Sequence, residues 1–411
     1  MQKTNPGPRL ATLVATGTAL LMLHPATAAA LNGPSWQNID GGPLGPLQIS
    51  AGTDGYFYGQ SGTATDSGQS IAGTKSVGAE IDDFMIEMRK PTGLIQFTLQ
   101  AAEYTNINLG ANRPKEINGN AYTTGPIRAA FITLAPSKAF NISVGQVNSV
   151  EGYESAFAWN NPVALRTVIA AVQNSESRGI SAVYNHGKFS GTIVFGDGYD
   201  TGVFNYLQFL LTETFDASNS LNLYGGVALG VTGPNAFAYG SGGESAGGAN
   251  GVGGQGQLAA VNSNLIGAWY TWSHGGLSLT PEAQYQYAKP LHRYEFATSG
   301  GVSDDIPKTT SNFATAVFAD YQFAKSPYSL GAWVEYATSK GSAAQDAWFV
   351  APNAQLVGLA VAPTWQHRNL YARLNMGYVH LLDQGTPAAG FGNAGQGTSQ
   401  VVATMEFGLV F

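Results

Sequence analysis

Apolar side chains recur at every second position over the last residues of the chain, 401–411. Successive side chains of a β-strand point to opposite faces, so this period of two predicts a strand with one apolar face. That face would carry Val401, Ala403, Met405, Phe407, Leu409 and Phe411. The opposite face would carry Val402, Thr404, Glu406 and Gly408. An apolar strand face needs lipid or a protein core to cover it, and the choice between the two decides the class of protein.

A terminal Phe at the end of such a strand resembles the assembly signal of bacterial outer-membrane barrels. The resemblance implies that the barrel-assembly machinery recognises the C-terminal strand that ends at Phe411. The alternative on this segment alone is a soluble β-sandwich whose last strand ends in Phe.

The other end of the chain predicts export. Lys3 and Arg9 precede an apolar run at 10–23, and the segment finishes in three alanines at 28–30. Charged, apolar and small-residue regions in this order are typical of a secretory signal peptide, which we place at residues 1–30. We expect residues 31–46 to form a periplasmic N-terminal segment. No later stretch reaches the roughly 20 apolar residues that a transmembrane helix needs, which excludes a helical membrane protein.

Composition narrows the class further. Only 11% of the 411 residues are charged, whereas about 25% is usual in soluble domains. Much of the outer surface is therefore expected to face lipid. Without the predicted signal peptide, 17 basic residues stand against 26 acidic ones, a formal charge of −9. This balance argues against nucleic acid as a partner. Cysteine is absent, so no disulfide framework holds the exported chain together.

Connections of two kinds alternate along the chain. Short ones, rich in turn-forming residues, occur at 90–93, 136–139, 186–188, 216–220, 274–276, 324–327 and 367–369. Long ones occur at 60–76, 106–125, 148–177, 197–205, 232–257, 289–309, 340–353 and 382–397. Seven short turns and eight long loops separate sixteen strands over residues 47–411. Short periplasmic turns and long outer loops are typical of an all-β, transmembrane, antiparallel up-and-down β-barrel. A count between about fourteen and eighteen strands would leave this class unchanged.

The region around the third long loop carries a family resemblance. The stretch from Val144 to Ser155, the pair Asn160 and Asn161, then Arg166 and the stretch 179–184 resemble the OmpL-like family of outer-membrane β-barrel porins of Gram-negative bacteria. The match is strongest over residues 127–198 and elsewhere rests on the strand rhythm. The resemblance implies a porin-like barrel in the bacterial outer membrane, in contact with outer-membrane lipid. It does not imply a particular solute.

The third long loop, residues 148–177, is the candidate constriction. A barrel of this size leaves an aqueous channel, so selectivity needs a loop that folds inward. We expect Glu151 and Glu154 to present carboxylates to the pore, with Arg166 facing them or the wall. The alternative is that these charges tie the loop to the wall and line nothing. Charged residues on the strand faces opposite the lipid are the candidates for the pore lining: Arg89, Glu87, Arg128, Glu282, Glu335, Arg373 and Glu406.

The sequence thus predicts a porin through which small hydrophilic solutes or ions diffuse passively, with a modest preference for cations. No catalysis, cofactor or metal is expected. A homotrimer is expected from porin analogy alone. Two alternatives stay open, namely a structural or adhesive barrel with a blocked lumen, and a barrel hydrolase. The glycine pattern at 251–256 matches a dinucleotide-binding motif, but it lies in a Gly- and Ser-rich stretch without the strand and helix that this motif requires.

Overall fold

The computed structural model describes residues 31–64, 75–105, 107–109, 126–199, 201–233, 258–292, 306–341, 353–385 and 390–411. The predicted signal peptide and the glycine pattern at 251–256 lie outside these residues. Within the described part of the chain, no helix is long and apolar enough to cross a membrane.

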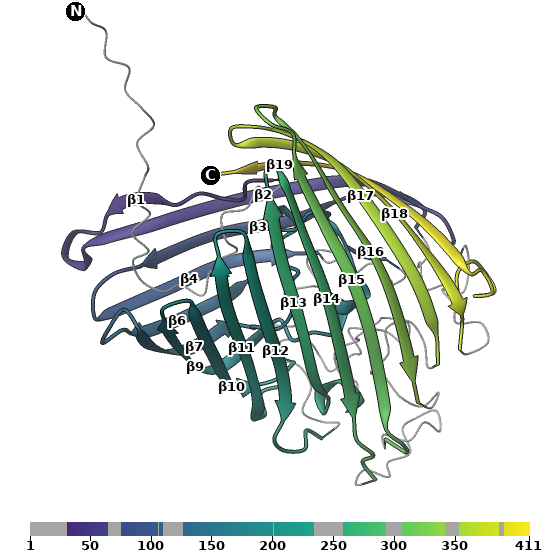
Figure 1. Ribbon diagram of the computed structural model, residues 1–411, viewed down its shortest axis with the longest axis horizontal. Helices are drawn as coiled ribbons and strands as arrows, with labels where there is room; N and C mark the ends of the chain where they lie inside the picture. Colours follow the sequence, from purple (N-terminus) through teal and green to yellow (C-terminus); the bar gives the residue numbers. More distant parts are fainter. Residues whose placement is uncertain are drawn as a thin grey trace, which may run out of the picture.

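Sixteen antiparallel strands form a closed barrel, in agreement with the sequence prediction (Figure 1). In chain order they are β2 (Pro46–Gln60), β3 (Val77–Lys90), β4 (Ile95–Tyr104), β6 (Ile127–Leu134), β7 (Phe140–Asn148), β9 (Glu176–His186), β10 (Phe189–Asp197), β11 (Phe204–Asp216), β12 (Asn219–Ala228), β13 (Asn264–His274), β14 (Leu277–Ala288), β15 (Thr310–Gln322), β16 (Tyr328–Lys340), β17 (Gln355–His367), β18 (Leu370–Asp383) and β19 (Ser399–Val410).

The described chain also has seven short elements outside the barrel wall. They are β1 (Gln37–Asp40), η1 (Gly42–Leu44), β5 (Ile107–Asn108), η2 (Ala158–Asn160), β8 (Leu165–Arg166), α2 (Val168–Ala171) and α3 (Leu258–Val261).

The last strand closes the barrel against the first. β19 pairs with β2 from Val402 opposite Gln60 to Val410 opposite Gly52. Beyond the strand end, the Phe411 amide donates to the Ala51 carbonyl at 2.8 Å, and the Ala51 amide donates back at 2.7 Å. Every wall strand therefore has two neighbours. Closure is what a sheet needs in lipid, because an open edge would leave backbone groups without hydrogen bonds.

The alternation predicted from the sequence decides which residues face out. Phe407 is 46% exposed, whereas its neighbour Glu406 is 0% exposed. The same pattern holds along β12, where Leu221 and Leu223 are exposed while Asn222 and Tyr224 are buried. The outer face is thus apolar and suited to lipid, and the polar side chains turn to the interior.

The predicted short turns join consecutive strands, and the predicted long loops join the alternate pairs. Since neighbouring strands run antiparallel, this alternation places all seven short turns at one end of the barrel. Both ends of the wall, at Pro46 and Phe411, lie at that same end.

Residues 31–46 pack against the short-turn end of the barrel. β1 extends this end by pairing with β2. Asn32 exchanges backbone hydrogen bonds with the side chain of Gln366, at 2.8 and 2.9 Å. The guanidinium of Arg89 lies 3.5 Å from the ring centre of Trp36, within reach of a cation–π interaction. The segment is therefore part of the folded domain, and its periplasmic location stays a prediction.

Candidate functional site: the loop inside the barrel

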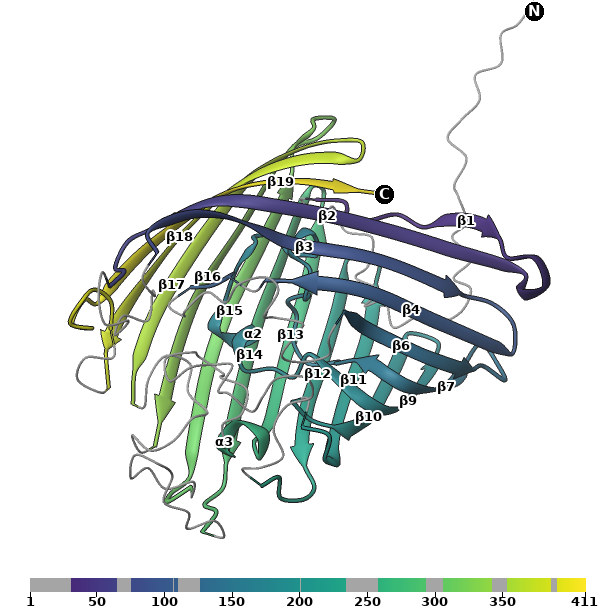
Figure 2. The ribbon, with the colours of Figure 1, turned by 180° about the vertical axis from the view of Figure 1, so that it is seen from behind.

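The third long loop lies inside the ring of strands, between β7 and β9 (Figure 2). It contains η2, β8 and α2. α2 begins after Thr167, and its first amide, from Val168, donates to the Glu335 carboxylate at 3.0 Å. A carboxylate at this position satisfies an otherwise unpaired amide at the start of the helix. A wall residue thus fixes where the loop becomes helical.

One flank of the loop packs on the wall through apolar side chains. Leu165, Val168 and Ile169 are fully buried against inward-facing residues that include Phe318 and Trp333. Burial of each such aliphatic side chain contributes about 1.5–3 kcal/mol. Small residues of the wall make room for the loop: Ala314, Ala316, Ala360 and Ala362.

Backbone contacts bring the loop close to the strands. The Trp333 indole donates to the Leu165 carbonyl at 2.7 Å. A Cβ atom at Gly331 would lie 1.7 Å from the carbonyl oxygen of Pro162, so only glycine fits at this position. This approach fixes the loop on β16.

The second long loop also contributes. β5 pairs in parallel with β8, placing Ile107 opposite Leu165. The Leu109 amide donates to the Arg166 carbonyl at 3.2 Å. The sequence prediction included neither this pairing nor the apolar patch of the inner wall. The alanines at alternate positions of β15 and β17, on the face expected to be polar, were the signal for the patch.

The opposite flank of the loop is polar. Glu151 is buried, and its carboxylate accepts hydrogen bonds from the Asn174 amide at 2.9 Å and the Tyr206 hydroxyl at 3.0 Å. Burial raises the pKa of Glu151 to about 7, although these two hydrogen bonds oppose the shift. Nearby, the Glu282 carboxylate of β14 accepts from the Tyr153 amide at 3.1 Å and the Tyr224 hydroxyl at 2.7 Å. Tyrosine hydroxyls and backbone amides therefore hold one oxygen of Glu282 and both oxygens of Glu151 at this flank, and Oε2 of Glu282 accepts no hydrogen bond from the described residues.

Within the loop, Glu154 accepts hydrogen bonds from the amide and the hydroxyl of Thr167. Burial raises the pKa of Glu154, while the charge of Arg166 opposes that shift. Both side chains are less than 10% exposed. These contacts brace the turn that precedes α2.

The loop meets the wall again at η2. The Arg373 guanidinium of β18 donates to the carbonyls of Asn161 at 2.9 Å and Ala158 at 3.0 Å. It also contacts both oxygens of Glu406, at 2.9 and 2.8 Å. A bidentate pair of this kind holds the guanidinium in one orientation. Arg373 thus connects the loop backbone to the last strand.

The predicted constriction residues are all buried. Glu151 lies with Tyr206 and Asn174, and Glu154 lies with Thr167 and near Arg166. These contacts favour the alternative interpretation, in which the charges hold the loop in place. A role in setting the ion preference of the pore stays a prediction.

The predicted lining residues occupy the inner face, and the structure divides them among several contacts. Glu282, Glu335 and Arg373 bond to the loop. Arg373 and Glu406 pair with each other. The remaining three lie on β3 and β6. Glu87 accepts from Gln100 at 2.5 Å, Arg89 donates to Gln48 at 2.9 Å, and Arg128 pairs with Glu176 at 2.7 Å.

Comparisons with known proteins agree with this architecture. The family model described as "Putative beta-barrel porin-2, OmpL-like" matches residues 46–411. No curated protein matches the chain. Among solved structures, OmpT of Vibrio cholerae is 9% identical with a TM-score of 0.55, covering 91% of this chain and 100% of that one.

Two further structures have the same fold. An anion-selective porin from Comamonas acidovorans is 11% identical with a TM-score of 0.53, covering 89% of this chain and 99% of that one. OmpF of Salmonella typhi, in complex with daunomycin, is 14% identical with a TM-score of 0.51, covering 91% of this chain and 100% of that one. At these identities the likeness shows the fold alone. The family model covers the whole barrel, and the chain therefore belongs to the OmpL-like β-barrel porin family of outer-membrane proteins.

Proposed function

We propose that the protein is a porin through which small hydrophilic solutes and ions diffuse passively across the bacterial outer membrane. The observation that carries the proposal is a closed barrel whose third long loop is fixed inside the ring of strands by contacts on both flanks. A loop in this position would narrow the lumen and still leave a passage beside it. Membership of a porin family supports a channel, and we propose no catalytic reaction and no cofactor.

Planar bilayers test this function. Purified protein should insert and give discrete current steps. Deletion of residues 151–166 should raise the single-channel conductance, because it removes the part of the loop that crosses the lumen. Deletion of residues 241–250, from the long connection that the sequence predicts at 232–257, is the control and should leave the step size unchanged. Insertion without any current would overturn the porin proposal. An unchanged step after the first deletion would remove the constriction from it.

The packing inside the barrel also favours a second candidate. The apolar contact of the loop with β15 to β18 fills part of the lumen with aliphatic side chains. A structural or adhesive barrel with a blocked lumen would use such a filling. The same bilayer measurement separates the two, since a blocked barrel inserts and gives no current.

Charge and assembly complete the proposal. The formal charge of −9 that follows from removal of residues 1–30 supports a modest cation preference, which the reversal potential in a salt gradient measures. Glu151, Glu154 and Arg166 would contribute by setting the position of the loop. We also propose a homotrimer, and recognition of the strand that ends at Phe411 by the barrel-assembly machinery. Gel migration of unheated and heated samples tests the trimer.

A further inference from the structure

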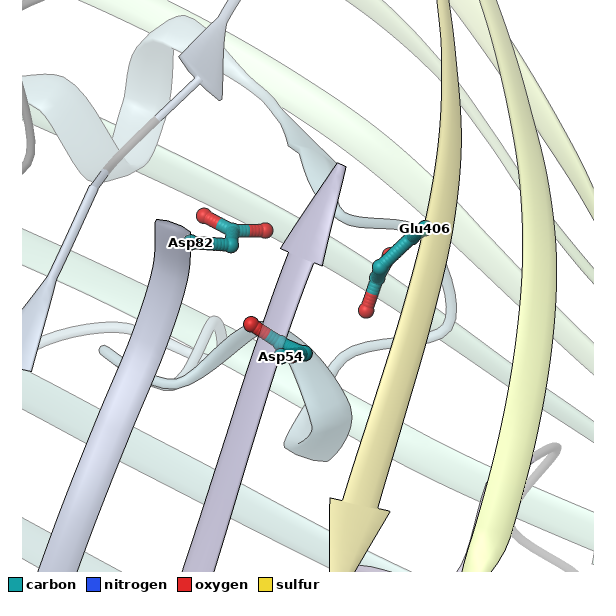
Figure 3. Close-up of side chains that lie close together, drawn as sticks. All are labelled: Asp54, Asp82 and Glu406. Carbon is teal, nitrogen blue, oxygen red and sulfur yellow. The ribbon is translucent and has the colours of Figure 1, made fainter. Parts of the chain in front are cut away.

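Four carboxylates meet on the inner wall beside η2. Asp54 of β2, Asp82 of β3 and Glu406 of β19 point toward one another from three adjacent strands (Figure 3). One oxygen from each lies within 4.8 Å of the other two. Asp83 adjoins them, since its amide donates to the Asp54 carboxylate at 2.7 Å. The four side chains are between 0% and 5% exposed.

A β-bulge brings these carboxylates together. The register between β2 and β3 shifts between Thr53, which lies opposite Phe84, and Gly55, which lies opposite Ile81. Ile81 and Phe84 are exposed on the outer face, and the two residues between them both turn inward. A regular strand would send one of these two aspartates toward lipid. The sequence analysis did not pair these aspartates with Asp54 and Glu406, because the register across strands decides the meeting.

The cluster carries more negative charge than the protein balances. The basic side chains that act on it are Arg373, which pairs with Glu406, and Arg166, which also acts on Glu154. Four carboxylates against two guanidinium groups, one of which is shared with Glu154, leave at least two negative charges among buried atoms. Buried charges without compensation are costly, so a counter-ion or bound protons must neutralise them.

The hydrogen bonds of the cluster are incomplete as well. Both oxygens of Asp82 and Oδ1 of Asp83 accept no hydrogen bond from the described residues. Asp82 is 1% exposed and points into the cluster. The single hydroxyl proton of Tyr371 faces two carboxylates, those of Asp54 and Glu406. Unpaired buried carboxylate oxygens in such numbers call for a partner, and a bound cation would supply one.

We propose that Asp54, Asp82 and Glu406, with Asp83 beside them, form a binding site for one divalent cation, with Ca²⁺ as the preferred ion. The donors are all carboxylate oxygens, which hard cations prefer. Ca²⁺ takes six to eight oxygens in flexible geometry, whereas Mg²⁺ gives up its waters reluctantly and is seldom held by protein oxygens alone. A buried site lined by carboxylates, with both oxygens of Asp82 free of hydrogen bonds, therefore favours Ca²⁺. Its two positive charges would offset two of the unpaired negative ones.

Such a cation would fix the loop to the wall. Asp83 accepts a hydrogen bond from the Ala158 amide of η2, and Glu406 orients Arg373, which binds the Ala158 and Asn161 carbonyls. The site therefore links β2, β3 and β19 to the loop. It departs from the sequence expectation of no metal, and it stands or falls independently of the transport function.

Calorimetric titration of Ca²⁺ tests the site in full-length protein that has been refolded in a detergent free of lipopolysaccharide and treated with a chelator. The expected result is one saturable site per chain, with binding weakened at least about tenfold, or about 1.4 kcal/mol, in Asp82→Asn and in Asp54→Asn. The control is Asp320→Asn, which changes another buried carboxylate of the inner wall and should bind as the unaltered protein does.

A second readout is thermal unfolding. Ca²⁺ should raise the unfolding temperature of the unaltered protein and of Asp320→Asn, while Mg²⁺ should raise it less. Neutral Asn removes repulsion within the cluster, so the Asp82→Asn protein is expected to fold. Absence of saturable binding by the folded unaltered protein would overturn the site and would mean that bound protons neutralise the cluster. Binding that is unaffected in both Asp→Asn variants would place the ion elsewhere and would overturn it equally.

Discussion

Two regions of the loop, the polar flank near β11 and β14 and an η2 flank near β2, β3 and β19, hold buried carboxylates in different ways. At the flank near β11 and β14, Glu151 and Glu282 each accept hydrogen bonds from a tyrosine hydroxyl and a backbone amide. At the flank near β2, β3 and β19, four carboxylates crowd together, and Arg373 is the guanidinium that pairs with one of them. Both flanks are buried in the same interior.

A buried carboxyl group needs hydrogen-bond partners, and a buried carboxylate also needs a positive charge to compensate its own. A carboxyl group with two donors and no guanidinium partner tolerates burial by holding its proton, as the raised pKa of Glu151 indicates. Several carboxylates that outnumber their guanidinium partners need a further positive charge, and loss of that charge leaves the negative ones without compensation. The first flank should therefore respond to pH, and the second to loss of a cation.

The largest effect is expected from Arg373→Met. The substitution removes the bidentate partner of Glu406 and both hydrogen bonds to the loop backbone. Loss of one member of a buried ion pair costs about 3–5 kcal/mol. Urea unfolding in lipid vesicles, followed by tryptophan fluorescence, measures this loss. Arg178→Met is the matched control, because Arg178 is 26% exposed where it pairs with Asp197. An equal loss in both variants would erase the distinction between the flanks.

Gly331→Val should act at the close contact between β16 and the loop, which belongs to neither of these two flanks. Its Cβ would overlap the Pro162 carbonyl at 1.7 Å, so the loop must move away from β16. Overpacking of this kind costs about 1–3 kcal/mol. Unfolding in vesicles measures the loss, and bilayer recordings should show a changed conductance step. Gly59→Val is the control, since nothing lies within 4 Å of a Cβ there. Unaltered stability and conductance in Gly331→Val would contradict the close seating of the loop.

The pH dependence of stability probes the polar flank. The pKa of Glu151 is raised to about 7 from 4.5, so the folded state keeps a proton that the unfolded state releases. Stability from this group is complete below pH 4.5 and is lost as the pH rises to about 7. The variant Glu151→Gln keeps the shape without the titration and should remove this part of the dependence. If the free energy of unfolding depends on pH in the same way in both proteins across that range, Glu151 does not hold a proton in the folded state.

Much of the barrel could be predicted from the sequence, because lipid outside and polar contacts inside impose a local period of two. The strand that ends at Phe411 and the seven short turns follow from that period and from turn chemistry. The site could be predicted only as a loop and a set of inward charges. Which charges meet depends on the register across strands, as with Arg373 and Glu406.

Inward apolar residues were beyond the same reasoning. Phe318 and Trp333 lie on inner faces where the pattern predicts polar side chains, because the loop supplies a core that the wall sequence alone does not reveal. The pairing of β5 with β8 joins two different loops, so no local pattern could indicate it. The sequence thus describes the wall well, and the interior depends on contacts between distant residues.

The smallest effect is expected from Tyr206→Phe. It tests whether the hydrogen bond from the tyrosine hydroxyl stabilises the buried carboxylate of Glu151. The substitution removes one hydrogen bond from the carboxylate, a change worth about 1 kcal/mol. The same hydrogen bond lowers the pKa of Glu151, so without it the pKa should rise further above 7. The range of pH over which stability is lost should therefore extend upward in Tyr206→Phe. Tyr285→Phe, on the exposed outer face, should leave that range unchanged. If the two variants shift the range equally, the difference between the flanks lies in burial alone and the hydroxyl donors have no part in it.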